Sequence, residues 1–270
     1  MNIDRTKTSR ELLAFYSEAG VDIALREEPN DWLSADEPTP VAAAEPATTQ
    51  RPPEPVRAVS APIPPAAPVP PPPDTAVMAA REAARSAASL DELRTILDRF
   101  EGCALKNGAS RLVFADGTPG SRLMLVGEAP GAEEDRQGLP FVGRSGQLLD
   151  RMLAAIGLDR SKVYIANIVP WRPPGNRTPT PVETQICLPF VQRQIELCDP
   201  DVLVTVGQPS TGALLGMQGI MKNRGRWFSY QTGTREIRAM PMLHPAYLLR
   251  SPIGKRLAWR DLLAIKNALG

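Results

Sequence analysis

From residue 76 onward, short apolar runs alternate with stretches in which apolar residues recur at helical spacing. The short runs predict buried strands at residues 123–126, 163–169, 202–206 and 237–243. The helical spacing predicts helices at residues 75–88, 90–100, 146–156, 181–197, 209–215 and 258–269. Strands that alternate with helices imply a parallel sheet with right-handed crossovers. We therefore predict an α/β fold, a three-layer αβα sandwich around a central four-stranded parallel sheet.

The beginning of the chain has a different pattern. Residues 1–30 contain one stretch of amphipathic helical spacing, which predicts a short N-terminal helical segment. Residues 33–99 contain no aromatic residue, and 14 of the 29 prolines lie in residues 38–73. So little apolar surface does not offset the entropy of ordering the chain. We expect residues 31–75 to be a disordered Pro/Ala-rich linker, and the helix is either a docking element or a dispensable end.

Charge divides the chain at the same place. Residues 1–75 carry 6 basic and 12 acidic side chains, whereas residues 76–270 carry 25 and 18, so the net charge of +1 hides a basic C-terminal part. This asymmetry is a weak indication of a polyanionic partner. No run reaches the roughly 20 apolar residues of a membrane span, and the N-terminus lacks the layout of a secretory signal. We expect a soluble, cytoplasmic monomer with no membrane partner.

Side chains capable of chemistry follow all four predicted strands. Glu128 follows the first strand, Asn167 lies in the second, Ser210 follows the third, and His244, the only histidine, follows the fourth. The carboxyl ends of parallel strands meet at one edge, where open α/β sheets bind ligands. A neutral imidazole there can donate to a developing oxyanion, and a carboxamide can pair with two positions of a pyrimidine edge. Phe141, in a loop rich in turn residues, would be a stacking platform.

Each of these residues also has an ordinary structural interpretation. Glu128 with the acidic residues 133–135 suits a solvated βα loop, and Asn167 suits a turn cap. Phe141 can pack in the core, and His244 can be a turn residue that binds a nearby carbonyl. Taken together, these interpretations require a coincidence at all four strand ends. The pattern therefore favours one shared polar site.

Three long motifs carry a resemblance to a known family. GEAPGAEEDRQGLPFVGRSGQLLD (127–150), YIANIVPWRPPGNRTP (164–179) and HPAYLLR (244–250), in this order and spacing, closely resemble the family 4 uracil-DNA glycosylases. The resemblance runs from about residue 102 to the C-terminus. It implies an enzyme that flips uracil out of single- or double-stranded DNA and hydrolyses its N-glycosidic bond. Free uracil and an abasic site would be the products, in a nucleoid-associated function that begins base excision repair.

The resemblance also implies roles for residues by their positions in the motifs. Glu128 matches the acid that orients the attacking water, and His244 matches the residue near the uracil carbonyl oxygen. The uracil-binding positions are Gly127, Ala129, Phe141 and Asn167. Residues 245–250 resemble the loop that enters the duplex, with Tyr247, Leu248, Leu249 and Arg250 as the DNA-contacting residues. Candidates for phosphate contacts, which the sequence does not distinguish from solvated surface residues, are Arg144, Arg172, Arg177, Arg250 and Ser210.

The family further implies a [4Fe–4S] cluster held by four cysteines. Cys103 and Cys187 match two of the ligand positions, but Lys106 and Trp171 occupy the other two. Neither residue type replaces a thiolate, so we expect no cluster and no other metal, with the bulk of Trp171 in part of the cluster's volume. The third cysteine, Cys198, matches no ligand position. Without the resemblance, three scattered cysteines are typical of small buried apolar residues.

Two other functions stay open at this point. One is a uracil-DNA binding or sensing protein with little turnover, against which the intact Glu128 and His244 argue. The other is a hydrolase of free nucleosides or nucleotides, which would have no DNA requirement. A phosphate-loop nucleotidase is disfavoured because no Gly-Lys-Ser/Thr follows the first strand. The crosslinking relatives of the family are disfavoured because residues 140–146 carry no basic, histidine-containing insertion.

Overall fold

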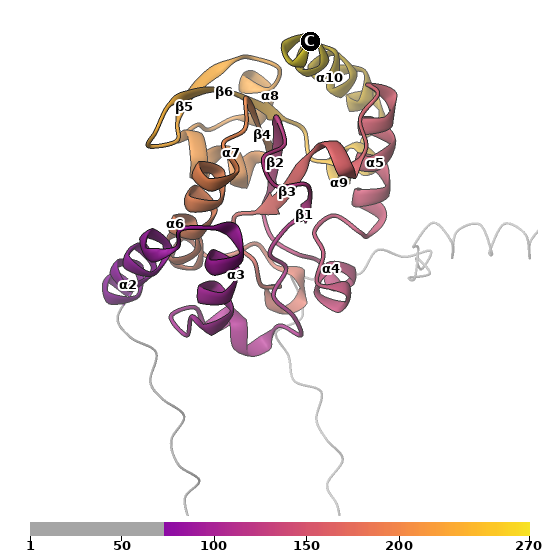
Figure 1. The fold of residues 1–270 in the computed structure, drawn as a ribbon. Helices are drawn as coiled ribbons and strands as arrows, with labels where there is room; N and C mark the ends of the chain where they lie inside the picture. The colour runs from indigo at the N-terminus through magenta and orange to yellow at the C-terminus, as the bar shows by residue number, and fades with distance from the viewer. Residues whose placement is uncertain (1–72) are drawn as a thin grey trace, which may run out of the picture. The chain divides into compact units, whose positions relative to one another are not determined.

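The computed structural model describes residues 73–270 of the chain (Figure 1). The predicted helical segment at residues 1–30 and nearly all of the predicted linker at residues 31–75 lie outside this range, and both stay predictions. Residues 73–75 already belong to the first described helix. Within residues 73–270, none of the helices has the length and apolar character needed to cross a membrane.

Six strands form one mixed sheet in the spatial order β1-β3-β2-β4-β6-β5. Its centre consists of parallel strands β3 (Tyr164–Asn167), β2 (Leu123–Gly127), β4 (Val202–Val206) and β6 (Glu236–Met242). The edges are the antiparallel strands β1 (Asp116–Gly117) and β5 (Phe228–Gln231). The α/β fold and its central four-stranded parallel sheet are confirmed, and the two antiparallel edge strands are additional to the prediction.

The two edge strands have too little pattern to be predicted from the sequence. β1 has two residues, one half-buried and one exposed. β5 buries a single residue, Tyr230, and its other three side chains remain accessible to different degrees. Both strands form because they pair with a neighbouring strand, since neither has an apolar run of its own.

Side chains of the central strands alternate between two hydrophobic cores, as the pleat of a strand requires. In β4, Val202, Val204 and Val206 belong to one core, and Leu203 belongs to the other. In β2, Leu125 and Met124 divide in the same way. All of these side chains are almost fully buried. Strands that are buried on both faces need a helical layer on each side.

Helices supply these two layers (Figure 1). One layer contains α2 (Pro73–Ser86), α3 (Leu90–Arg99), α6 (Pro181–Cys198) and α7 (Gln208–Leu215). The other contains α5 (Arg144–Ala155), α9 (Pro245–Arg250) and α10 (Lys255–Leu269). Shorter helices in the connections are α4 (Ala132–Gln137), α8 (Ile220–Asn223), η1 (Ala104–Gly108), η2 (Arg160–Lys162), η3 (Pro174–Asn176) and η4 (Pro252–Gly254). The predicted three-layer arrangement is confirmed.

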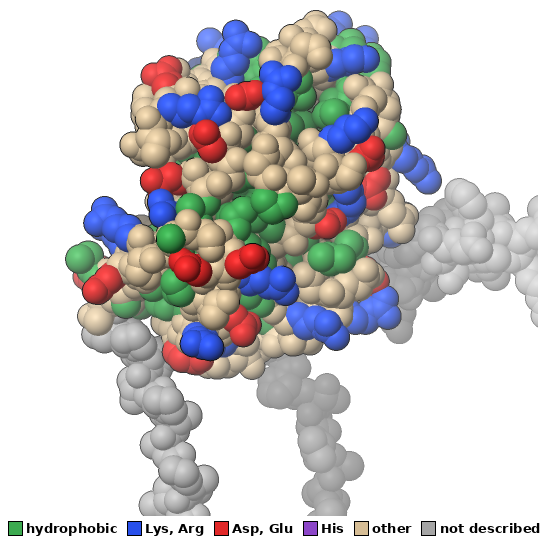
Figure 2. Space-filling model, in the orientation of Figure 1, with side chains coloured by type: hydrophobic (Ala, Val, Ile, Leu, Met, Phe, Trp, Pro, Cys, Tyr) green, Lys and Arg blue, Asp and Glu red, His purple; other side chains and the backbone are tan. Residues whose placement is uncertain are grey.

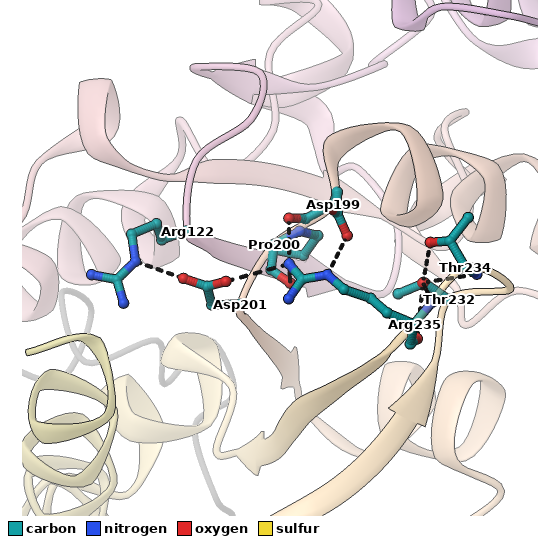
Figure 3. Close-up of polar contacts among 7 residues, drawn as sticks. All are labelled: Arg122, Asp199, Pro200, Asp201, Thr232, Thr234 and Arg235. Atoms are coloured by element: carbon teal, nitrogen blue, oxygen red, sulfur yellow. Dashed lines mark hydrogen bonds and ion pairs between the residues drawn. The ribbon is translucent and has the colours of Figure 1, made fainter.

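An ion-pair cluster fixes the amino-terminal edge of the sheet (Figure 3). Arg122 Nε donates to Asp201 Oδ2 at 2.6 Å, and these residues precede β2 and β4. Arg235, which precedes β6, donates from Nε to Asp199 Oδ1 at 2.6 Å and from its terminal nitrogen to the Pro200 carbonyl at 3.1 Å. The cluster holds three strand beginnings together at this edge. These ion pairs leave the opposite edge, at the carboxyl ends of the strands, free to form a ligand site.

The strand order reverses beside β2. The chain passes from β2 to β3 on one side of it and then crosses to β4 on the other side. In an open α/β sheet, the loops at such a reversal diverge and leave a crevice at the carboxyl ends of the strands. Glu128 and Asn167 lie at this crevice because they end or directly follow β2 and β3.

Candidate active site

The carboxyl edge of the sheet carries a pocket of about 250 Å³. Glu128, Phe141, Asn167 and His244, all predicted from the sequence, line it together with Ala129. These residues come from loops after β2 and β6 and from the end of β3. Their convergence on one cavity is what the strand-end pattern predicted.

Asn167 presents its carboxamide to the pocket from the end of β3. The residue is 5 % exposed, and within residues 73–270 no hydrogen bond engages its side-chain amide. Gly127 allows this placement, because a Cβ there would lie 2.5 Å from Oδ1 of Asn167 and 2.6 Å from Cζ of Phe141. The carboxamide therefore has one acceptor and two donor hydrogens available for a ligand.

Phe141 has an unusual backbone conformation, with φ of +54°. A bulky residue in the left-handed region costs about 1–3 kcal/mol and persists only when its surroundings enforce it. The Phe141 carbonyl accepts a hydrogen bond from Arg160 and packs against Gly146, where a Cβ would lie only 1.6 Å from the carbonyl oxygen. The strained backbone directs the ring into the pocket lining and not away into the loop.

Glu134, which the sequence reasoning missed, organises this loop. Its Oε1 accepts hydrogen bonds from the backbone N–H groups of Val142 at 3.0 Å and Gly143 at 2.9 Å. Its Oε2 accepts from the N–H of Gly131 at 3.1 Å. The carboxylate is 8 % exposed and lines the pocket. Its position three residues after a turn glycine, like the glutamate of a capping box, was the available signal.

His244 is held as a neutral ring with a defined tautomer. Its Nδ1 accepts the backbone N–H of Ala246 at 3.0 Å, so the single proton of the neutral imidazole resides on Nε2. Burial, and secondarily the positive charge of Arg250, lower the pKa of His244 to about 4, against an opposing effect of Glu134. The ring also stacks on Phe141, with centroids 5.5 Å apart and planes at 26°. At neutral pH the residue offers the pocket a neutral N–H donor.

The pKa of Glu128 is shifted in the opposite direction to that of His244 by the same environment. Burial raises the pKa of the Glu128 carboxyl above its ordinary value, and a hydrogen bond with the Thr178 side chain lowers it in part. Desolvation disfavours the charged form, which is the anion for an acid and the cation for a histidine. A partly desolvated carboxylate is a stronger base than one in water, which suits it to activate a water molecule.

The predicted DNA-contacting residues divide into two groups. Arg144, Tyr247, Leu249 and Arg250 are exposed on α5 and α9, the helices that follow the pocket loops. Ser210 and Leu248 are buried instead, and the DNA contacts predicted for them stay predictions. The Ser210 hydroxyl donates to the Gly207 carbonyl at 3.2 Å, and Leu248 packs in the core beside α5 and α10. Helical periodicity explains the second case, since adjacent leucines of a helix face different sides.

The remaining two arginines are engaged by other side chains. Arg177 lines the pocket, but it donates to both carboxylate oxygens of Glu183, at 2.9 and 2.7 Å. The hydrogen bonds from Arg177 lower the pKa of Glu183 to about 2. The resulting carboxylate balances much of the charge of Arg177. Arg172 donates to Oδ1 of Asn176 at 2.7 Å and lies 4.0 Å from Asp135. Both positions brace the loop that covers the pocket.

The two cysteines singled out in the sequence are adjacent and buried. The sulfur atoms of Cys103 and Cys187 are 3.8 Å apart. Trp171, 2 % exposed, belongs to the same hydrophobic core, and the Lys106 ammonium turns to Glu101 at 2.5 Å. In the described part of the chain, no group of three or more His, Cys, Asp or Glu side chains has the arrangement of a metal site.

Comparison with known proteins now defines the class. Residues 114–263, more than half of the chain, match the family model of the uracil DNA glycosylase superfamily. The fold and the pocket described above agree with this class of DNA N-glycosylase.

Individual relatives narrow the family. The chain is 36 % identical to the type-4 uracil-DNA glycosylase of Sulfurisphaera tokodaii over 66 % of this chain and 84 % of the relative. It is 42 % identical to that of Thermotoga maritima over 55 % and 77 %, and 36 % identical to that of Saccharolobus solfataricus over 67 % and 88 %. The chain belongs to the type-4 uracil-DNA glycosylase family.

Gly127→Ala tests the construction of the pocket. The added methyl would displace both Asn167 and Phe141, so we expect affinity for free uracil to fall about tenfold or more, a free-energy change of 1.4 kcal/mol or above. The affinity for free uracil is measured as its inhibition of base release from a uracil-containing oligonucleotide. Gly108→Ala is the matched control, because its Cβ would meet nothing within 4 Å. Unchanged uracil affinity in Gly127→Ala would contradict the pocket assignment.

Proposed function

We propose that the pocket binds an everted uracil and that Glu128 and His244 carry out hydrolysis of its N-glycosidic bond. The observation that carries the proposal is the convergence of a stacking ring, an unengaged carboxamide and a neutral N–H donor on one cavity. A base inside a duplex is inaccessible, so an enzyme of this kind must extrude it at a cost of a few kcal/mol. Stacking on Phe141 offsets part of that cost.

Asn167 supports selection of uracil over cytosine. Its oxygen would accept the uracil N3–H, and its NH₂ group would donate to the neighbouring O4. Cytosine presents an acceptor and a donor in the reverse order, so two polar groups would be left unpaired in a buried pocket. Each such group costs about 1–3 kcal/mol.

His244 and Glu128 stabilise opposite charges in the proposed reaction. As the bond from C1′ to N1 breaks, N1 keeps the electron pair, the uracil becomes an anion and the sugar becomes oxocarbenium-like. The Nε2–H of His244 would donate to the uracil carbonyl oxygen and stabilise the anion. Glu128, as a carboxylate, would stabilise the cationic sugar and orient a water molecule whose oxygen adds to C1′. The proton lost by this water goes to Glu128 and then to solvent.

The exposed residues that follow the pocket loops support contact with the rest of the DNA. Leu249 and Tyr247 are the exposed large apolar side chains of α9, and Leu249 is the candidate to fill the space left by the extruded base. Arg144 and Arg250 are candidates for phosphate contacts beside it, and such contacts position DNA without reading its sequence. Both single-stranded and double-stranded DNA fit this proposal.

We further propose that the chain works without an iron–sulfur cluster. The thiols of Cys103 and Cys187 are the only two cysteine ligands at the matching positions, and the neighbouring side chains do not fit the group. Lys106 is a cation already paired with Glu101, and the apolar bulk of Trp171 fills the core around the thiols. A cluster held by four thiolates has no ligand set here. None of the proposed catalytic steps passes through a metal.

Base release tests the proposed roles. Oligonucleotides that contain uracil, cytosine, thymine or hypoxanthine at one position are incubated with wild type, Asn167→Ala and His244→Ala in single-turnover assays. We expect release of uracil by wild type, and rates about 10²–10³-fold lower in His244→Ala, the range for loss of an oxyanion donor. Asn167→Ala should weaken uracil selectivity over cytosine. Retained uracil release in both variants would overturn the site assignment, and binding without release by wild type would favour a sensing protein.

The pH dependence separates the two catalytic groups. The proposed active form has Glu128 ionised and His244 neutral. As pH falls, Glu128 is protonated first, because its pKa is raised, while His244 stays neutral down to about pH 4. We expect the single-turnover rate to decline on acidification, with this limb abolished and the remaining rate about 10²–10⁴-fold lower in Glu128→Gln. An acid limb that persists unchanged in Glu128→Gln would assign it to another group.

Iron analysis tests the cluster proposal. We expect protein purified without oxygen exposure to be colourless and to contain neither stoichiometric iron nor acid-labile sulfide. Cys103→Ala with Cys187→Ala should then retain uracil release, since the thiols act only as packing groups. A brown protein with four irons per chain, bleached and inactivated by removal of the metal, would contradict it.

A further inference from the structure

A second concave surface lies beside the loop that carries Phe141. It has a volume of about 770 Å³ and is formed by α3, η1, the segment after η1 and the end of α4, with Trp171 in one wall. We call it the basic groove. Its lining contains the cations Arg94, Arg99, Lys106 and Arg111 against a single carboxylate, Asp98. In Figure 2, basic and acidic side chains are both visible on the part of the surface where Figure 1 places α3.

Some arginines of the described part of the chain are paired with carboxylates, and others are not. Arg122, Arg160, Arg177 and Arg224 each lie within ion-pair distance of a carboxylate. Within residues 73–270, no carboxylate lies within 4.0 Å of the guanidinium groups that line the basic groove, namely those of Arg94, Arg99 and Arg111. Cations gathered around one hollow repel one another, so their placement there favours an anionic ligand.

The basic groove is connected to the uracil pocket through a fixed element. Asp135, 4 % exposed, accepts the backbone N–H groups of Ser110 at 2.8 Å and Arg111 at 3.2 Å. This bond ties the segment that carries Arg111 to α4, whose neighbouring residue Glu134 holds the pocket loop. The Arg111 side chain also lies against Gly138, which lines the basic groove. Gly138 is three residues before Phe141, the aromatic residue of the pocket. The two concavities thus share one rigid wall.

We propose that the basic groove binds backbone phosphates of the uracil-containing strand, on one side of the extruded nucleotide. The inference rests on the proposed function, because it extends the path of the same substrate. Guanidinium groups match phosphate oxygens in geometry and charge, and such contacts hold a strand without sequence preference. Lys106 also lines the groove, from a position where the family resemblance has a cluster cysteine, but its ammonium is paired with Glu101. An extended strand reaches the groove directly from the pocket, because the wall between them is the short 137–141 segment.

Oligonucleotide length and charge removal test the proposal on the full chain. The triple variant Arg94→Gln, Arg99→Gln, Arg111→Gln is compared with wild type on single strands that end next to the uracil or are extended on the 5′ side or on the 3′ side. We expect extension on one side only to tighten binding by wild type, and the triple variant to lose this gain. Loss of three phosphate contacts should make the slope of log affinity against log salt less steep by about 2.

A matched triple variant controls for net charge. Arg260→Gln, Lys266→Gln and Lys222→Gln remove the same number of charges from exposed positions outside the groove and the pocket. This control should keep the wild-type length dependence. Equal behaviour of the two triple variants would overturn the groove proposal, as would extension effects that are equal on both sides. Release of uracil from the short strand tests the pocket separately, so failure there with retained one-sided binding would count against the proposed function alone.

Discussion

One buried carboxylate determines the shape of the pocket. Glu134 accepts three backbone N–H groups, from Gly131 on one side and from Val142 and Gly143 on the other. It thereby joins the turn after β2 to the loop that carries Phe141. Charge-assisted bonds of this kind are stronger than neutral ones, and a buried carboxylate without them would be costly. The strained conformation of Phe141 persists because this clamp and Arg160 fix the loop from two directions.

The pocket also shows how one environment prepares two groups for opposite tasks. Burial lowers the pKa of His244 and raises that of Glu128, because water no longer stabilises either charge. For the histidine, the result is a neutral ring whose tautomer is set by the N–H of Ala246. For the glutamate, the result is a more basic carboxylate. Partial burial in one pocket is thus the main cause of both pKa shifts.

The parts of this architecture that follow from local pattern were predictable from the sequence. Apolar runs located the four central strands, and the carboxyl-edge rule placed Glu128, Asn167 and His244 together. The parts that depend on tertiary contacts were not. β1 and β5 exist because a neighbouring strand offers hydrogen bonds, and the role of Glu134 depends on backbone groups eight and nine residues away. The burial of Ser210 and Leu248 was likewise decided by which side of a short helix faces the core.

The region around Cys103 and Cys187 shows how ordinary packing can hold a segment in place. Trp171, the adjacent thiols and the edge-to-face pair Phe100 and Phe190, with centroids 5.1 Å apart, belong to one hydrophobic core. Aromatic burial of this size contributes several kcal/mol, and it has no requirement for a ligand. This packing fixes α3 and η1 against the rest of the core. Arg94 and Arg99 of α3 then lie in the lining of the basic groove.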